Sequence, residues 1–191
     1  MTSFPRSRVQ PLEPPYEPEL ARTLQRMMPP GMEPLKLFRT VAHNPAILDK
    51  LRSTGTYLLN FGTLDPADRE LVIHRTCARC RCEYEWGVHA RLFARAVGLT
   101  EEQIAATVIE PARPGPWSPR QTALVEMVDQ LHDTATLSCE LFATLRTQFS
   151  DAQLVELLAL TGQYHAVSFM ANGLRVEAEA EAERFPPPPP A

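Results

Sequence analysis

Four helix-start signals constrain the fold more than any other feature of this 191-residue sequence. Two place a capping residue before a proline, at Asp65-Pro66 and Ser118-Pro119, and two are capping boxes, at Thr100–Gln103 and Ser150–Gln153. Ser, Thr and Asp side chains satisfy the free N–H groups of a first helical turn, and proline fits its first position. Apolar residues recur at helical spacing behind the caps, and no segment alternates with the period of two that a strand requires. The sequence therefore predicts an all-α fold.

The prolines indicate how the chain is divided. Many of the 19 prolines lie near the two ends, and the sequence finishes with the run FPPPPPA. We expect an extended, proline-rich N-terminal arm over residues 1–30, one helical domain over residues 31–180, and a polyproline tail over residues 181–191. The alternating Glu and Ala of residues 176–184 predict a solvated helix end.

Composition narrows the partners and the compartment. Lys and Arg total 19 against 23 Asp and Glu, a net charge of -4, which argues against nucleic acid or an anionic membrane as the main partner. No apolar run approaches the ~20 residues of a membrane span, and the N-terminus does not resemble a secretory signal. The four cysteines are not spread as in a disulfide scaffold. We expect a cytoplasmic protein with free thiols and a small-molecule ligand.

Residues 77–89, with the sequence CARCRCEYEWGVH, concentrate thiols, carboxylates and a histidine. If one helix ends near Arg79 and the next begins near Cys82, then Cys82, Glu85 and His89 lie on one stripe of the second helix. Histidine is the most common general acid or base near neutral pH. The spacing therefore predicts a pocket that a thiol, a carboxylate and an imidazole share.

The three clustered thiols differ in expected reactivity. A cysteine in the first turn of a helix has a lowered pKa, so Cys82 is a better candidate for a reactive thiolate than Cys77 or Cys80. The same cysteines with His89 give the zinc-like spacing C-x2-C-x-C-x6-H. A rigid helix cannot wrap these ligands around a tetrahedral ion, and we therefore expect no metal there.

Glu70, Cys82 and His89, followed by the GLTEEQ segment at 98–103, resemble the carboxymuconolactone decarboxylase and alkylhydroperoxidase D-like superfamily. In its peroxidase branch the motif is a glutamate, then CxxC, then three residues and a histidine. The position of the second motif cysteine is Glu85 in this chain. The resemblance covers roughly residues 35 to 175, and the phrase CEYEWGVH is typical of a decarboxylase-like branch.

The resemblance implies a helical bundle that forms homo-oligomers, commonly trimers or hexamers. It favours a cofactor-independent decarboxylase or isomerase that acts on a small carboxylated lactone or related carbonyl compound. His89 would deliver a proton to carbon, Glu70 would set its tautomer, and Glu85 would be a second acid or would orient the substrate.

Two other functions stay open at this point. A thiol-dependent alkylhydroperoxidase would use Cys82, with Cys80 or Cys77 as the resolving thiol. A non-catalytic helical oligomer would keep the motif as scaffold only. The enzyme that uses acid–base catalysis requires His89 and no thiol, the peroxidase requires Cys82, and the scaffold requires neither.

Further residues are candidates for substrate binding. Tyr84 and Trp86 either wall the site or pack in the core. His165 lies on a late apolar helix, where it is either a core histidine or a second histidine that reaches the pocket. His132 and His43 have no neighbours of this kind in the sequence, and we expect both on the surface.

Overall fold

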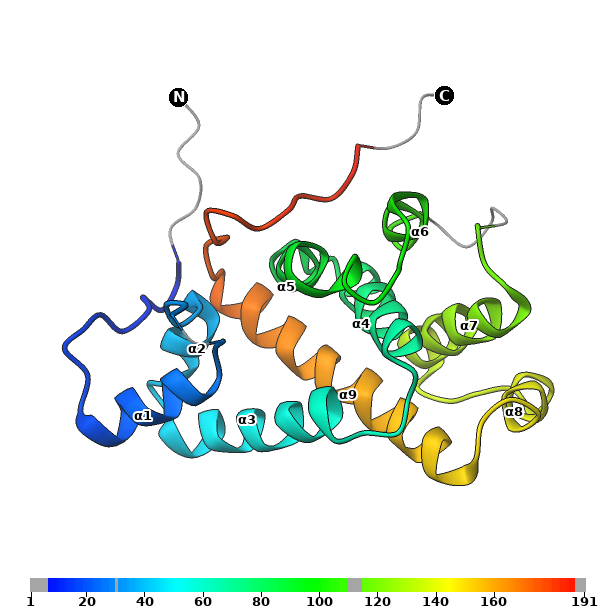
Figure 1. The fold of residues 1–191 in the computed structure, drawn as a ribbon, viewed down its shortest axis with the longest axis horizontal. Coiled ribbons are helices and arrows are strands. Elements are labelled where there is room, and N and C mark those ends of the chain that lie inside the picture. Colours follow the sequence, from blue (N-terminus) through cyan, green and yellow to red (C-terminus); the bar gives the residue numbers. More distant parts are fainter. Residues whose placement is uncertain (1–6, 30, 110–114, 188–191) are drawn as a thin grey trace.

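The computed structural model describes residues 7–29, 31–109 and 115–187, and every regular element in these ranges is helical (Figure 1). None of the described helices is long and apolar enough to cross a membrane. The elements are α1 (Pro18–Arg26), α2 (Lys36–Val41), α3 (Pro45–Asn60), α4 (Pro66–Arg79), α5 (Glu83–His89), the π-helical turn η1 (Ala90–Ala94), α6 (Glu101–Ala106), α7 (Pro119–Thr134), α8 (Cys139–Arg146) and α9 (Asp151–Leu174).

The four predicted helix starts are confirmed. The Asp65 carboxylate accepts hydrogen bonds from the first-turn amides of α4. Thr100, Ser118 and Ser150 each form a complete capping box with the glutamine three residues later. The caps explain why these helices begin where they do, since each satisfies amides that would otherwise lack a partner.

The long helix α9 runs through the middle of the molecule, with α3 on one side of it and α4 and α5 on the other (Figure 1). α4 packs against both α7 and α9, and its residues 70–77 are all buried. Arg75 fixes α4 to α7 through a bidentate pair with Asp129, at 2.7 and 2.8 Å. Its remaining guanidinium nitrogen donates to the carbonyls of Thr107 and Ile109, both at 2.8 Å. Buried charge is thus fully paired at this junction.

The N-terminal segment differs from the extended arm that the prolines predicted. It contains α1, which begins with Pro18 at its first position and buries Leu24 completely. Leu20 packs against the core one turn earlier. A proline at the first turn favours a helix, and the two leucines four residues apart give that helix an apolar side.

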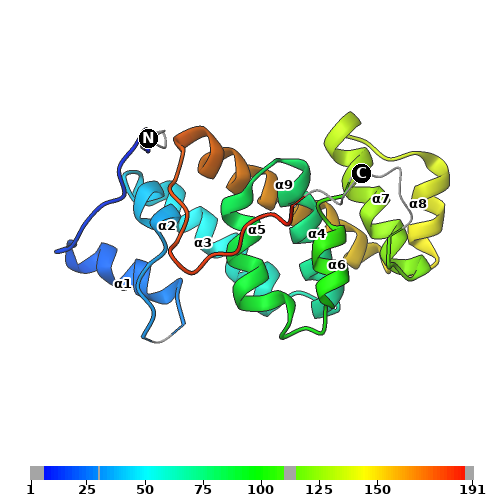
Figure 2. The same ribbon diagram turned by 90° about the horizontal axis from the view of Figure 1, so that it is seen from above.

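The C-terminal segment also differs from the prediction. Arg175 adopts a left-handed conformation, with φ 53°, and ends α9 before the Glu and Ala residues. Residues 176–187 cross over α5 instead of continuing the helix (Figure 2). The Glu183 amide donates to the Gly87 carbonyl at 3.3 Å, and Phe185 packs edge-on against Trp86. Sequence periodicity did not predict this because the contacts join residues about 100 positions apart.

Candidate active site

The catalytic candidates come from a tight junction between α4 and α5. Arg81 takes a left-handed conformation, with φ 52°, in the turn that joins the two helices. The Cys82 amide then donates to the Cys77 carbonyl at 2.8 Å, and Cys82 becomes the N-cap of α5. The predicted end of one helix at Arg79 and start of the next at Cys82 are confirmed.

Glu70 on α4 and His89 on α5 form the central contact. Their atoms Oε2 and Nδ1 are 2.8 Å apart, and both side chains are almost completely buried. Glu70 also lies near His74, one turn further along α4, but its Oε2 atom is 3.9 Å from Nδ1 of that ring. His74 instead donates from Nδ1 to the Glu70 backbone carbonyl at 2.7 Å. A carboxylate at Nδ1 fixes the orientation of the His89 ring and leaves Nε2 for chemistry.

The three ionisable side chains at this contact, Glu70, His74 and His89, differ in their charge. Burial alone would lower the pKa of His89, but the adjacent carboxylates of Glu70 and Glu85 reverse this effect and raise it to about 10. Burial opposes ionisation of Glu70, yet the pKa of its carboxyl group is lowered by His89. Burial lowers the pKa of His74 to about 4, so this ring stays neutral. The site therefore holds an imidazolium on His89 and a carboxylate on Glu70 at neutral pH.

The other nitrogen of His89 faces two more polar groups. Tyr164 on α9 places its hydroxyl oxygen 3.1 Å from Nε2, and Glu85 places Oε1 3.5 Å from it. Burial, together with the nearby carboxylates, raises the pKa of Tyr164 well above its ordinary value. Tyr164 is therefore a neutral phenol that can both accept and donate a hydrogen bond.

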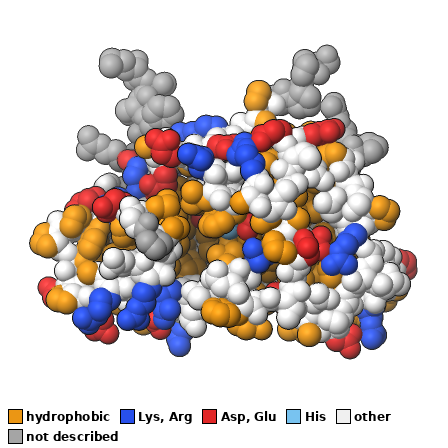
Figure 3. All heavy atoms as spheres, in the orientation of Figure 1, with side chains coloured by type: hydrophobic (Ala, Val, Ile, Leu, Met, Phe, Trp, Pro, Cys, Tyr) orange, Lys and Arg blue, Asp and Glu red, His pale blue; other side chains and the backbone are white. Residues whose placement is uncertain are grey.

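A cavity of about 200 Å³ adjoins this face of the histidine. Figure 3 shows a hollow on the viewed face that is lined mostly by hydrophobic side chains. Among the described residues, the buried Oε2 atom of Glu85 has no hydrogen-bond partner. The cavity is lined by His89, Glu85 and Tyr164, by the apolar residues Met27, Met28, Pro29, Leu35, Phe38, Leu51, Leu59, Val88, Leu92, Phe93 and Val167, and by Arg26, Arg52, Gly55, Thr56, Asn60 and Gln163.

Cys82 differs from the expected thiolate. Burial raises the pKa of its thiol to about 12, and the nearby Glu85 carboxylate adds to the effect. The short helix α5 carries two glutamates in its first turn, which oppose the positive end of its dipole. Cys82 is fully buried and is not among the described residues that line the cavity. Of the three residues predicted to share one side of this helix, Glu85 and His89 line the cavity, and Cys82 does not.

The predicted substrate-binding aromatics also lie elsewhere. The Tyr84 hydroxyl donates to Glu179 at 2.5 Å and accepts from the Leu37 amide at 3.0 Å. Trp86 donates from Nε1 to the Thr107 hydroxyl at 2.9 Å. Both side chains hold the surrounding segments together, and neither is among the described residues of the cavity wall.

On α9 the predicted substrate-binding residue was His165, but its neighbour Tyr164 is the one that lines the cavity. His165 does not line the cavity; its Nε2 atom lies 3.1 Å from Nδ1 of His132, which the sequence placed alone on the surface. Tyr164 reaches the site instead. Helical spacing could have identified it, because Tyr164 continues the buried series of Leu157, Leu160 and Thr161, whereas His165 lies about 100° away.

Comparison with known proteins finds one family that part of the chain resembles. Residues 45–130 match the model of the carboxymuconolactone decarboxylase family. The chain is similar to this family over these residues. The matched region contains Glu70, Cys82, Glu85 and His89, and it ends before α9, which supplies Tyr164. A comparison with curated proteins gave no match.

Solved structures share the fold of this chain over most of its length. A peroxidase-related protein from Silicibacter sp. TM1040 has 16% identity and a TM-score of 0.82, covering 97% of this chain and 100% of its own. A putative antioxidant defence protein AhpD from Agrobacterium tumefaciens has 22% identity and a TM-score of 0.67, with coverage of 74% and 96%. The debrominase Bmp8 has 15% identity and a TM-score of 0.75, with coverage of 91% and 92%. At these identities the likeness establishes the fold and not the reaction.

Proposed function

We propose that this protein is a cofactor-independent decarboxylase or isomerase that uses acid–base chemistry at His89. The observation that carries the proposal is the chain of contacts from Glu70 through His89 to Tyr164, which ends at an apolar cavity. A charged imidazole whose Nδ1 atom is fixed by a carboxylate is a positioned proton donor at Nε2. The apolar wall strengthens each of these electrostatic interactions.

The reaction follows from these proton positions. Nε2–H of His89 donates to the Tyr164 oxygen, so the phenol O–H is available to a substrate carbonyl oxygen. When the bond to a β-placed carboxylate breaks, carbon dioxide leaves and its electron pair forms an enolate, which Tyr164 stabilises. His89 then gives its Nε2 proton to the carbon and regains a proton from water.

The cavity indicates a small, partly apolar anion as the substrate. Besides the His89 imidazolium, Arg26 and Arg52 are the cations among the described lining residues, and they suit a substrate carboxylate. The unpartnered Oε2 atom of Glu85 suits a substrate hydroxyl donor. A neighbour of the same fold, a variant of debrominase Bmp8 with cysteine replaced by alanine, was solved in complex with 2,3,4-tribromopyrrole. That complex supports a small ring compound as the ligand class.

The experiment measures solvent deuterium incorporation and carbon dioxide release with a panel of small carboxylated lactones and 3-oxo acids. We expect His89→Gln to abolish turnover and Cys82→Ser to retain most of it. Cys139→Ser, at an exposed thiol, is the matched control for the cysteine substitution. Arg26→Gln should raise KM more than it lowers kcat.

The main rival is a thiol peroxidase, in keeping with the names of two structural neighbours. Peroxide consumption with a thiol reductant, measured on the same variants, separates the two functions. Loss of peroxide turnover in Cys82→Ser, with lactone and oxo-acid turnover absent in the unmodified protein, would replace our proposal with the peroxidase. If the unmodified protein shows none of these activities, the non-catalytic scaffold replaces both.

We also propose that the protein acts as a homo-oligomer, and a trimer or hexamer is the expected size. Large apolar side chains are exposed on α3 and α9, among them Tyr57, Val155 and Phe169, with exposed fractions of 55%, 68% and 66%. Exposed apolar surface of this kind favours association. Light scattering coupled to size-exclusion chromatography tests this, and a monomer at micromolar concentration would contradict it.

A further inference from the structure

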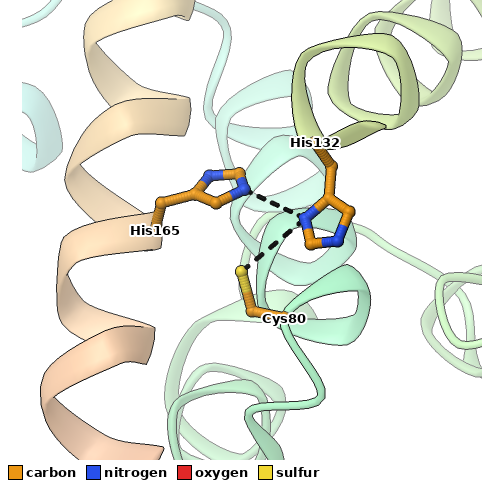
Figure 4. Close-up of side chains that lie close together, drawn as sticks. All are labelled: Cys80, His132 and His165. Carbon is orange, nitrogen blue, oxygen red and sulfur yellow. Dashed lines mark hydrogen bonds between the residues drawn. The ribbon is translucent and has the colours of Figure 1, made fainter. Parts of the chain in front are cut away.

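A second polar cluster lies outside the cavity, where three helices meet. Cys80 is the C-cap of α4, His132 lies in the last turn of α7, and His165 lies in the middle of α9. Figure 4 shows the three side chains turned toward one another. The thiol Sγ, Nδ1 of His132 and Nε2 of His165 all lie within 4.8 Å of one another, and each residue is half-buried. The cluster is therefore assembled by the fold and remains open to small ions.

The backbone sets the tautomer of one ligand. Nδ1 of His165 lies 2.9 Å from the Thr161 carbonyl oxygen, which can only accept a hydrogen bond. The proton of His165 is therefore on Nδ1, and the lone pair of Nε2 points at the cluster. A backbone carbonyl that holds the remote nitrogen in this way is the usual support for a metal-binding histidine.

The distances fit a tetrahedral ion. With Zn–S of about 2.3 Å and Zn–N of about 2.0 Å, tetrahedral geometry separates two nitrogens by roughly 3.3 Å and sulfur from nitrogen by roughly 3.6 Å. The two histidine nitrogens are 3.1 Å apart, and Sγ is 4.0 Å from Nδ1 of His132. The Cys80 thiol would therefore have to come closer to the nitrogens when an ion binds.

The surrounding charges do not oppose a cation. Arg79 acts electrostatically on Cys80 and His132, and it pairs with Asp133 at 2.5 Å and approaches Asp129 at 3.5 Å. The positive charges of Arg75 and Arg79 are thus matched by the two aspartates. A thiolate ligand would give the site itself one negative charge, which favours a divalent ion.

We propose that Cys80, His132 and His165 bind a borderline-soft divalent cation, Zn²⁺, with one solvent-facing position left for water. One thiolate and two imidazoles suit Zn²⁺ far better than the hard ions Mg²⁺ and Ca²⁺, which prefer oxygen ligands. The bound ion would join the ends of α4 and α7 to α9. This site is separate from the cavity of the proposed reaction, so either proposal can fail without the other.

The experiment titrates tag-free, metal-stripped protein with Zn²⁺ by calorimetry and with Co²⁺ by absorption spectroscopy. We expect one ion per chain and a thiolate-to-Co²⁺ charge-transfer band. Cys80→Ser should abolish the band, and His132→Gln and His165→Gln should each weaken Zn²⁺ binding at least 10-fold. Circular dichroism of the metal-free variants checks that each remains folded.

Cys139→Ser and His43→Gln are the matched controls, because they remove a thiol and an imidazole elsewhere in the chain. Both should bind Zn²⁺ as the unmodified protein does. A Co²⁺ spectrum without the thiolate band would overturn the proposal. So would Zn²⁺ affinity that is unchanged by all three ligand substitutions, or lost in Cys139→Ser.

Discussion

The Glu70 carboxylate should control the charge of His89, and Glu70→Gln is the substitution that tests this control. Glutamine has the shape of glutamate and can still accept the Nδ1 hydrogen bond, which is 2.8 Å long in the structure. It carries no charge, so the imidazolium loses its main partner. Burial, which opposes the charged form, then dominates the pKa of His89. We expect this pKa to fall steeply while the fold is retained.

The size of the fall follows from the geometry of the pair. With a 2.8 Å contact between Nδ1 and Oε2, the two charge centres lie about 4 Å apart. At an effective dielectric constant of 20 this attraction is about 4 kcal/mol, equivalent to about 3 pH units. The pKa of His89 should therefore fall from about 10 to roughly 7 or lower.

The assay is a pH titration of the imidazole nitrogen shifts by NMR. The chain has 5 histidines, and His89→Gln assigns the signal. Glu102→Gln, at an exposed carboxylate, is the control and should leave the His89 titration unchanged. If His89 of the unmodified protein titrates near 6.5, or if Glu70→Gln leaves its pKa unchanged, the assignment of a buried ion pair is wrong.

The same pair predicts how stability depends on pH. The folded-state pKa of His89 is raised, so its contribution is complete below about 6.5 and is lost as the pH rises through about 10. The folded-state pKa of Glu70 is lowered, so its contribution is lost on the acid side, below the ordinary value of 4.5. Between pH 6.5 and 10 the free energy of unfolding should decline by a few kcal/mol in the unmodified protein and less in Glu70→Gln. Parallel declines in both proteins would contradict this.

Three substitutions test the fold that supports the site. Arg75→Ala removes the bidentate partner of the buried Asp129 and leaves it only Arg79 at 3.5 Å, so it should cost about 3 kcal/mol in urea denaturation; a cost below about 1 kcal/mol would contradict the buried network. In Gly87→Ala the new Cβ would lie 2.0 Å from the Glu183 carbonyl oxygen, so the C-terminal segment should become sensitive to limited proteolysis, and unchanged resistance would refute that contact. Leu160→Ala in the core should cost about 2 to 5 kcal/mol, whereas Val155→Ala, on an exposed side of α9, should cost under 1 kcal/mol.

Local sequence signals predicted the helices and the junction at the site because their physics is local. A cap satisfies amides within three residues, so Ser118 and Ser150 could be identified without knowledge of packing. The spacing of Glu85 and His89 placed both on one side of α5 for the same reason. The family motif added Glu70, which lies 19 residues before His89 and could not be assigned to it by helical spacing.

The failed predictions depended on contacts between distant segments. The C-terminal Glu and Ala residues have high helix propensity, yet Tyr84 and Gly87 hold them as a crossing segment over α5. The prediction of a reactive thiolate at Cys82 was wrong for a similar reason. A position at the start of a helix favours ionisation of the Cys82 thiol. The neighbouring helices bury this thiol and raise its pKa, and the local sequence does not reveal that burial.

Glu85 occupies the position of the second motif cysteine, and the burial of Cys82 bears on what this replacement does. In the peroxidase motif this position is the second cysteine, whereas here it carries a carboxylate whose Oε1 atom lies 3.5 Å from His89. The other motif thiol, Cys82, is buried, and burial raises its pKa to about 12. A carboxylate next to an imidazolium stores and moves protons, not electrons. Under the proposed acid–base function, Glu85→Cys should therefore lower turnover of the carboxylated substrates, and unchanged turnover would count against a role for this carboxylate.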